Sequence, residues 1–140
     1  MKPRYLLDTN IVSELIKNPQ GVIAEKILAS GKDKYCCISI IVACELRYGA
    51  EKKGSTKLSF NVEQVLASLK IVPLQVDVDK VYAKIRVNLE RRGEPIGHHD
   101  LLIAAHALSL NLTVVTANEG EFRRVEGLKV ENWLKDSCSL

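Results

Sequence analysis

The sequence predicts an α/β protein in which helices cover both faces of a central, mostly parallel β-sheet, giving a three-layer sandwich. Short apolar runs alternate along the chain with longer segments in which apolar residues recur at helical spacing. The strand-like runs contain almost no polar residues, which is typical of parallel strands buried on both faces. Because no linker, repeat or low-complexity tract interrupts this alternation, we expect one domain, residues 1–140.

The first half of the chain is predicted to contain two strands and four helices. Apolar runs that end at polar residues predict the strands, and apolar residues spaced three and four apart predict the helices. In order these are a strand at 5–7, helices at 11–16 and 22–28, a strand at 35–40, a helix at 41–53 and, after a polar turn at 54–56, a helix through 69.

The second half continues the same alternation. The pattern of residues 70–76 predicts a strand. Pro73 indicates that this is an edge strand or has an irregular end, because proline cannot donate to a sheet ladder. The remaining elements are a helix at 78–92 that stops before Gly93, a loop around Pro95 and Gly97, a helix at 100–110 with Asn111 as its C-cap, a strand at 112–116, and a turn with one short strand at 125–130.

The composition is that of a globular protein, with 46% hydrophobic and 26% charged residues. The longest uncharged apolar runs are far too short to span a bilayer, and the N-terminus lacks a signal-peptide layout, so we expect no membrane association and a cytoplasmic protein. The net charge of +3 permits a polyanionic partner without requiring one.

The cysteines Cys36, Cys37, Cys44 and Cys138 include no C-x-x-C pair, and two of them are adjacent in an apolar stretch. This pattern favours buried small hydrophobic side chains over a zinc site or a disulfide framework.

Polar residues stand where the predicted strands end. Asp8, Thr9 and Asn10 follow the first strand, although one of them would suffice to cap the next helix. Glu45 lies among apolar residues, where a lone ionised carboxylate needs a partner, a proton or a metal. Asp100 precedes a long apolar run and would serve equally as a helix cap.

A further polar group, Thr116, Asn118 and Glu121, follows the strand at 112–116, where an ordinary turn is the alternative. In open parallel sheets, ligands bind beyond the carboxyl ends of the strands. Carboxylates that converge there repel one another unless a divalent cation neutralises them, and an all-oxygen set suits Mg²⁺ or Mn²⁺. Such ions support hydrolysis of phosphodiesters.

Four segments carry more specific patterns, namely LLDTNIVSELI (6–16), CELRYGAE (44–51), IGHHDLLIAAHALSLNLTVVTANEGEF (96–122) and VEGLKVENW (125–133). In this order and spacing they resemble the PIN-domain ribonuclease toxins of the VapC family. The resemblance covers nearly the whole chain without a large insertion. It implies a PIN-like fold and an endoribonuclease that depends on Mg²⁺, with Mn²⁺ as a substitute.

The resemblance also implies roles for individual residues. The first three acidic positions of the family fall on Asp8, Glu45 and Asp100, which would hold the metal, and the fourth, more variable position falls on Glu121. Thr9, Asn10, Thr116 and Asn118 would be polar companions of this catalytic set.

The implied partners are an RNA substrate, a second copy of the chain in a homodimer, and a small VapB-type antitoxin that covers the acidic cleft. DNA would be contacted only through the antitoxin. Leu15, Ile16 and the helix after Ser39 are candidates for an apolar groove that receives the antitoxin, although such residues more often belong to the core.

The chain departs from the family pattern at His98 and His99, where many relatives have a proline and an aromatic residue, and at Ala117, where many have an asparagine. Adjacent helical residues point about 100° apart, and His106 lies roughly 10 Å along the helix from His99, so these histidines do not share one ion. We therefore assign the metal to Asp100 and place His98 and His99 in the loop or at the rim. Candidate RNA contacts are Arg86, Arg91, Arg92 and His99, with a structural ion pair as the alternative for Arg86.

Two other functions remain open at this stage. A haloacid dehalogenase-like phosphatase also has an aspartate after its first strand, but Asn10 stands where a second acid or hydroxyl is common in that class. A PIN-like interaction module without catalytic turnover is the other alternative, and the complete acidic set argues against it.

Overall fold

The computed structural model describes residues 2–29 and 31–136. Its strands are β1 (Tyr5–Leu7), β2 (Cys36–Ser39), β3 (Lys70–Val72), β4 (Thr113–Val115) and β5 (Val130–Glu131). Its helices are α1 (Thr9–Lys17), α2 (Val22–Ala29), α3 (Ile40–Lys53), α4 (Thr56–Ser68), α5 (Val78–Arg91), α6 (His98–Ser109), α7 (Glu119–Phe122) and α8 (Trp133–Asp136), with a 3-10 turn at Lys32–Tyr35. Within these residues, no helix combines the length and apolar character needed to cross a bilayer.

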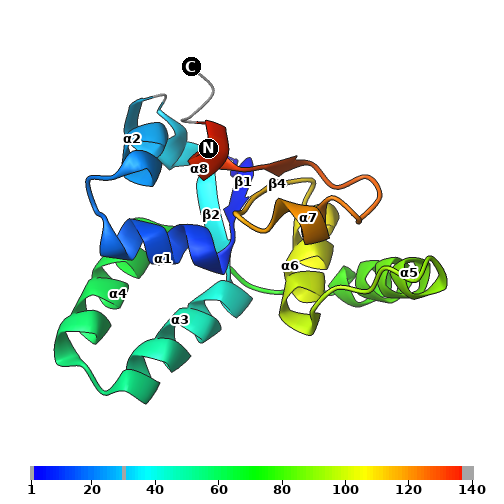
Figure 1. The fold of residues 1–140 in the computed structure, drawn as a ribbon, viewed down its shortest axis with the longest axis horizontal. Helices are drawn as coiled ribbons and strands as arrows, with labels where there is room; N and C mark the ends of the chain where they lie inside the picture. The colour runs from blue at the N-terminus through cyan, green and yellow to red at the C-terminus, as the bar shows by residue number, and fades with distance from the viewer. Residues whose placement is uncertain (1, 30, 137–140) are drawn as a thin grey trace.

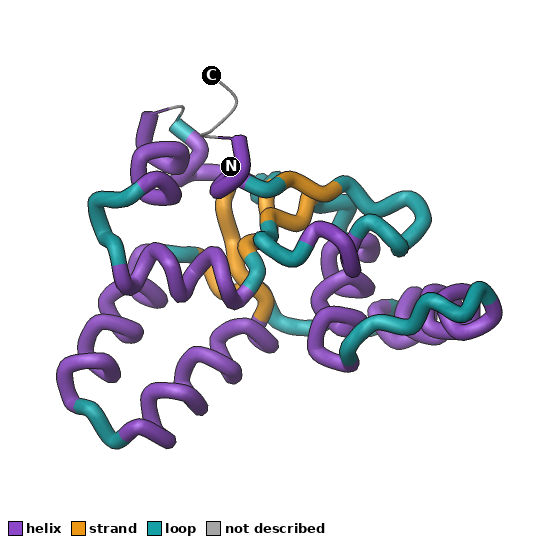
Figure 2. Tube along the Cα trace, viewed as in Figure 1, coloured by secondary structure: helices purple, strands orange, loops and turns teal. Residues whose placement is uncertain are grey.

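The five described strands form one sheet in the order β3-β2-β1-β4-β5, and every pair is parallel. The predicted α/β fold with a mostly parallel sheet is therefore confirmed. Leu6 of the central strand is in register with Cys37 of β2 and Val114 of β4. Residues that follow β1, β2 and β4 consequently emerge at the same edge of the sheet (Figure 2).

Helices cover the sheet from both sides, with α1, α3 and α4 on one side and α5 and α6 on the other (Figure 1). The three inner strands, β1, β2 and β4, carry fully buried side chains: Leu6, Leu7, Ile38, Val114 and Val115 have no exposed surface. Burial on both faces explains why the strands read as continuous apolar runs. Each such side chain contributes about 1.5–3 kcal/mol to folding, so the sheet is a rigid platform for the residues at its edge.

The helices that follow β1 and β2 begin at side-chain caps. Asp8 accepts a hydrogen bond from the backbone N–H of Thr9, and Ser39 accepts one from Ile41. Helix α3 is capped at its C-terminus by Gly54, whose φ of 64° lies in the left-handed region that favours glycine. The caps fix where α1 and α3 leave the sheet, and thereby fix the directions of the side chains that these helices carry.

Several element boundaries differ from the predictions. The strand expected at 70–76 ends at Val72, because Pro73 cannot donate to the ladder and Val76 is 88% exposed. Helix α6 begins at His98 and not at Asp100, so both histidines of the pair occupy its first turn and not the preceding loop. The short helices α7 and α8 were not predicted, since one turn is too short to show a periodicity.

The cysteine prediction is correct at two positions and wrong at a third. Cys36 and Cys37 are buried in β2, where burial raises the pKa of their thiols to about 12 and about 11. Cys44 is exposed on α3, because its neighbours Ala43 and Val42 face the core while it faces outward. Cys138 lies outside the described residues.

Candidate active site

Asp8 lies directly after the central strand and is only 3% exposed. Its Oδ1 accepts a hydrogen bond from the Thr9 N–H at 2.8 Å, and its Oδ2 accepts one from the Thr116 hydroxyl at 2.8 Å. Burial raises the pKa of Asp8, the bonds from Thr116 and Thr9 oppose that rise, and the negative charges of Glu45 and Glu121 add to it. Asp8 is therefore an oriented carboxylate in a strongly acidic environment.

Glu45 reaches the same edge from α3. Its Oε2 accepts a hydrogen bond from the hydroxyl of Thr9 at 3.2 Å. Its Oε1 is buried and accepts no hydrogen bond, while Nδ1 of His99 lies 3.5 Å away and forms an ion pair with it when the imidazole is protonated. A buried carboxylate oxygen without a hydrogen bond leaves a strong acceptor available for a cation.

Asp100 and Glu121 are joined by Asn118. The amide Nδ2 of Asn118 donates to Asp100 Oδ2 at 3.2 Å and to Glu121 Oε2 at 2.7 Å. Burial, a hydrogen bond with Glu121 and the charges of Asp8 and Glu121 raise the pKa of Asp100 to about 7. The same hydrogen bond lowers the pKa of Glu121, so Asp100 is the carboxyl of this pair that takes up a proton first as the pH falls.

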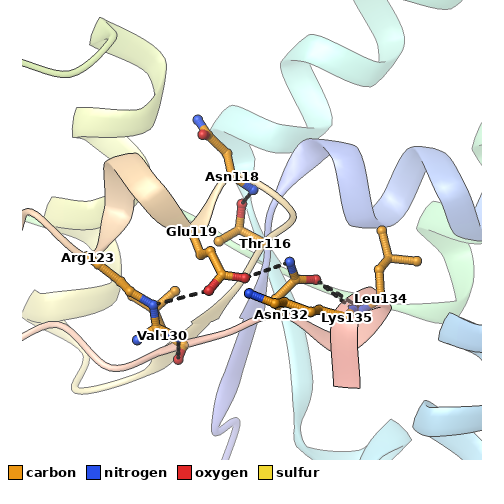
Figure 3. A network of polar contacts seen from close by, with 8 residues as sticks. All are labelled: Thr116, Asn118, Glu119, Arg123, Val130, Asn132, Leu134 and Lys135. Atoms are coloured by element: carbon orange, nitrogen blue, oxygen red, sulfur yellow. Dashed lines mark hydrogen bonds and ion pairs between the residues drawn. The ribbon is translucent and has the colours of Figure 1, made fainter. Parts of the chain in front are cut away.

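The two glutamates of α7, Glu119 and Glu121, have different hydrogen-bond partners: Glu121 accepts from Asn118, and Glu119 does not. Figure 3 shows Asn118 and Glu119 projecting to opposite sides of the turn that follows β4. Glu119 accepts hydrogen bonds from Asn132 at 2.8 Å and Arg123 at 3.4 Å, and it supports the packing of the C-terminal segment. Glu121 is thus the carboxylate of α7 that joins the acidic group.

These groups open onto one depression of about 420 Å³, lined by Asp8, Thr9, Asn10, Ser13, Glu14, Lys17, Glu45, Asp100 and Asn118. The structure therefore brings together three of the four predicted acids at the depression, with Glu121 bonded behind Asn118. Asn10 accepts a hydrogen bond from the Ala117 N–H at 3.2 Å, which ties α1 to the loop after β4.

The depression also contains residues that the sequence analysis missed, namely Ser13, Glu14 and Lys17. They follow Asn10 by three, four and seven residues, which is the spacing of one helix face. That spacing places Lys17, a cation that lines the depression from α1, on the same helix face as Asn10.

The oxygen donors of this site suit a hard divalent cation. Among residues 2–29 and 31–136, no three Asp, Glu, His or Cys side chains already enclose a position for a metal ion. The buried Oε1 of Glu45, which accepts no hydrogen bond, and the raised pKa of Asp100 nevertheless show that these carboxylates are crowded together at one edge of the sheet. Carboxylate and amide oxygens are the preferred ligands of Mg²⁺ and Mn²⁺, so the donor chemistry fits these ions.

The predicted arginines lie outside the depression. Arg86 donates to Glu90 at 3.2 Å and to the Tyr82 hydroxyl at 3.0 Å. These contacts are those of the structural ion pair that was the alternative to an RNA contact. Arg92 donates to the Arg124 carbonyl at 2.9 Å and also contacts Glu94, which holds the loop before α6. Arg91 is exposed, and its contact with RNA stays a prediction.

Comparison with known proteins agrees with this architecture. A model of the PIN domain family matches residues 5–128. The chain is 36% identical over 132 residues to Ribonuclease VapC2 of Rickettsia felis, a match that covers 94% of this chain and 98% of the relative. It is 37% identical over 132 residues to the tRNA(fMet)-specific endonuclease VapC of Shigella flexneri, with coverage of 93% and 98%.

Solved structures give the same result. The crystal structure of VapBC2 from Rickettsia felis, bound to a DNA fragment from its promoter, matches with a TM-score of 0.84 at 34% identity and covers 95% of this chain and 99% of that one. DNA-bound VapBC from Salmonella typhimurium also gives a TM-score of 0.84, at 36% identity, with coverage of 94% and 98%. The chain therefore belongs to the PIN-domain family and, within it, to the VapC ribonuclease toxins of toxin–antitoxin pairs.

Proposed function

We propose that this protein is an endoribonuclease that depends on Mg²⁺ or Mn²⁺ and acts as the toxin of its pair in the cytoplasm. The observation that supports the proposal most strongly is the group formed by Asp8, Glu45 and Asp100 around one depression at the carboxyl edge of the sheet. Relatives named as a ribonuclease and a tRNA-specific endonuclease match over nearly the whole chain.

In this proposal Asp8, Glu45 and Asp100 hold the ion, and Glu121 completes the acidic group from behind Asn118. When bound, such an ion activates water as a nucleophile and neutralises charge that develops on the phosphate oxygens. Thr116 and the Thr9 N–H keep Asp8 in one orientation, so this carboxylate needs little reorganisation on loading. Because the neighbouring acids raise the pKa of Asp100 to about 7, binding of the ion competes with protonation of this carboxyl near neutral pH.

The proposed protein partner is a VapB-type antitoxin, as in the VapBC structures that match this chain. An apolar groove of about 270 Å³ between α1, α3 and α4 includes Ile16, Leu46 and Val62 and adjoins the acidic depression through Thr9 and Glu45. A peptide with apolar side chains in this groove would cover the acids. Leu15, the other predicted residue, does not line this groove and packs against the core, to which Ile16, Leu46 and Val62 also belong. We also propose a homodimer, with DNA contacted only through the antitoxin.

The test is cleavage of structured RNAs, including tRNAs, by purified protein in Mg²⁺ or Mn²⁺. Discrete cuts are expected, and they should disappear with EDTA and in Asp8→Asn and Asp100→Asn. Glu119→Gln is the matched control, because Glu119 is an acid of the same region that faces Asn132 and Arg123.

Cuts that persist in both aspartate variants would contradict the assigned site. A folded protein that leaves all RNAs intact but hydrolyses phosphate monoesters would instead support the phosphatase alternative. A small open reading frame next to the gene of this protein is expected to encode the antitoxin. Its co-expression should restore growth to cells that express the toxin.

A further inference from the structure

His106 is a buried polar residue that the proposed chemistry does not use. It lies in α6, has no exposed surface, and is surrounded by the apolar core. Its Nδ1 lies 2.9 Å from the hydroxyl of Ser39, and its Nε2 lies 3.1 Å from the carbonyl oxygen of Pro73. Leucine would fill this space without the expense of burying a polar ring, so the imidazole must contribute through these two bonds.

The partners determine which ring nitrogen carries the proton. The carbonyl of Pro73 only accepts hydrogen bonds, so Nε2 carries a hydrogen and donates to it. Burial lowers the pKa of His106, which keeps the ring neutral and leaves Nδ1 as an acceptor. The Ser39 hydroxyl therefore donates to Nδ1, while its oxygen accepts from the Ile41 N–H. Every polar atom in this chain of bonds has a partner.

The chain of bonds connects the two helices that bear acidic residues. Ser39 is the N-cap of α3, which carries Glu45, and His106 belongs to α6, which carries Asp100. Ser39 is in register with Val72, so its bond and the bond to Pro73 also tie α6 to the ends of β2 and β3. Because α3 and α6 also contact each other directly, loss of this link is expected to change their relative orientation.

The lever is short. Glu45 lies six residues beyond Ser39, and Asp100 lies six residues before His106, so each acid is about 9 Å along its helix from the link. A tilt of about 5° at the link displaces a carboxylate at that distance by about 0.8 Å, given the helical rise. Displacements of about 1 Å in a catalytic arrangement reduce rates by about 100-fold.

We propose that His106 is a positioning residue: through its bond from Ser39 it sets the spacing between Glu45 on α3 and Asp100 on α6. The inference rests on the proposed function, since it assigns these two acids to one metal site. His106 does not touch substrate or metal, and it acts only through the orientation of the two helices.

Three substitutions separate the bonds. His106→Asn places an amide oxygen near the Nδ1 position and keeps the bond from Ser39, whereas His106→Gln places an N–H near Nε2 and keeps only the bond to Pro73. His106→Leu removes both. Ser109→Ala is the matched control on the same helix, because it removes the bond that the Ser109 hydroxyl donates to the His106 carbonyl without altering the link to α3.

The experiment measures kcat and KM for RNA cleavage, the Kd for Mn²⁺ alone by calorimetry, and the melting temperature. His106→Leu and His106→Gln should lose kcat by about 10- to 100-fold, with KM within about twofold. Both should bind Mn²⁺ about tenfold more weakly, whereas His106→Asn and Ser109→Ala should stay near wild type. Imidazole ¹⁵N spectra of the wild-type protein should show a hydrogen on Nε2 and none on Nδ1 of His106.

Unchanged kcat and Mn²⁺ affinity in folded His106→Leu would overturn the inference. The inference would also be overturned if His106→Asn and His106→Gln lost kcat equally and in proportion to their loss of melting temperature. That result would indicate a role in stability alone. If wild-type protein binds Mn²⁺ but cuts no RNA, the proposed function fails, and the Mn²⁺ affinities of the variants still decide whether His106 positions the acids.

Discussion

Replacing Asp100 by asparagine should stabilise the metal-free protein above neutral pH while it abolishes cleavage. In the folded protein, burial and the neighbouring acids Glu121 and Asp8 raise the pKa of Asp100 from 3.8 to about 7. The folded state therefore binds a proton in this pH range that the unfolded chain releases. As the pH rises through 7 the folded protein loses that proton and acquires an unfavourable buried charge. Asparagine keeps the shape of the side chain and carries no charge.

The gap between 3.8 and about 7 corresponds to about 4 kcal/mol for a fully buried group. Asp100 is partly exposed and solvent screens its charge, so we halve this to about 2 kcal/mol at pH 8. At pH 5, where the folded carboxyl is protonated, the gain should be less than half as large. For a chain of this length the gain at pH 8 corresponds to about 6 °C in Tm.

The assay is thermal unfolding in EDTA at pH 5 and pH 8, for wild type, Asp100→Asn and Glu119→Gln. Glu119 is the control because hydrogen bonds from Asn132 and Arg123 lower its pKa, so its removal should not stabilise the protein. A gain for Asp100→Asn that is equal at both pH values, or a loss of stability at pH 8, would refute the electrostatic reasoning. Added Mn²⁺ should stabilise wild type and leave Asp100→Asn nearly unchanged.

Three further outcomes are expected. Thr116→Val removes the hydroxyl that donates to Asp8, and it should lower the free energy of unfolding by about 1–3 kcal/mol in denaturant titrations and slow cleavage; unchanged stability would show that the bond is dispensable. Arg92→Ala should increase proteolysis of the loop before α6, detected by peptide mapping, because its bond to the Arg124 carbonyl is lost; an unchanged digest would argue against that role. Iodoacetamide should modify Cys44 well before the two buried cysteines of β2, as read by mass spectrometry, and equal rates would contradict the burial of β2.

The sheet and the main acids were predictable because their signals are local. Continuous apolar runs reveal strands buried on both faces, and Asp8 and Asp100 follow from polar residues beside such runs. The burial of Glu45 could be expected from its apolar neighbours, but the direction of its Oε1 depends on Thr9 and His99, which lie far away in the sequence. Local patterns do not contain such contacts.

The same limit explains what the sequence analysis missed. Helical spacing places Lys17 on the face of Asn10, yet only the packing of α1 beside α3 shows that this face lines the acidic depression. The raised pKa of Asp100 also arises from tertiary structure, because Asn118 donates to both Asp100 and Glu121, which lie 21 residues apart in the chain. In the sequence His106 cannot be distinguished from an ordinary core residue, because its bonds to Ser39 and Pro73 join segments that are far apart in the chain.

The central claim is that the acids at the carboxyl edge of the sheet hold the ion required for RNA cleavage. The most direct measurement is the anomalous scattering of Mn²⁺ in crystals of the wild-type protein at pH 8, with Asp8→Asn crystals as the comparison. The account predicts an anomalous peak in contact with Asp8 and Asp100, and no peak there in the variant. A peak elsewhere, or one that survives in Asp8→Asn, would contradict the assignment of this depression as the metal site.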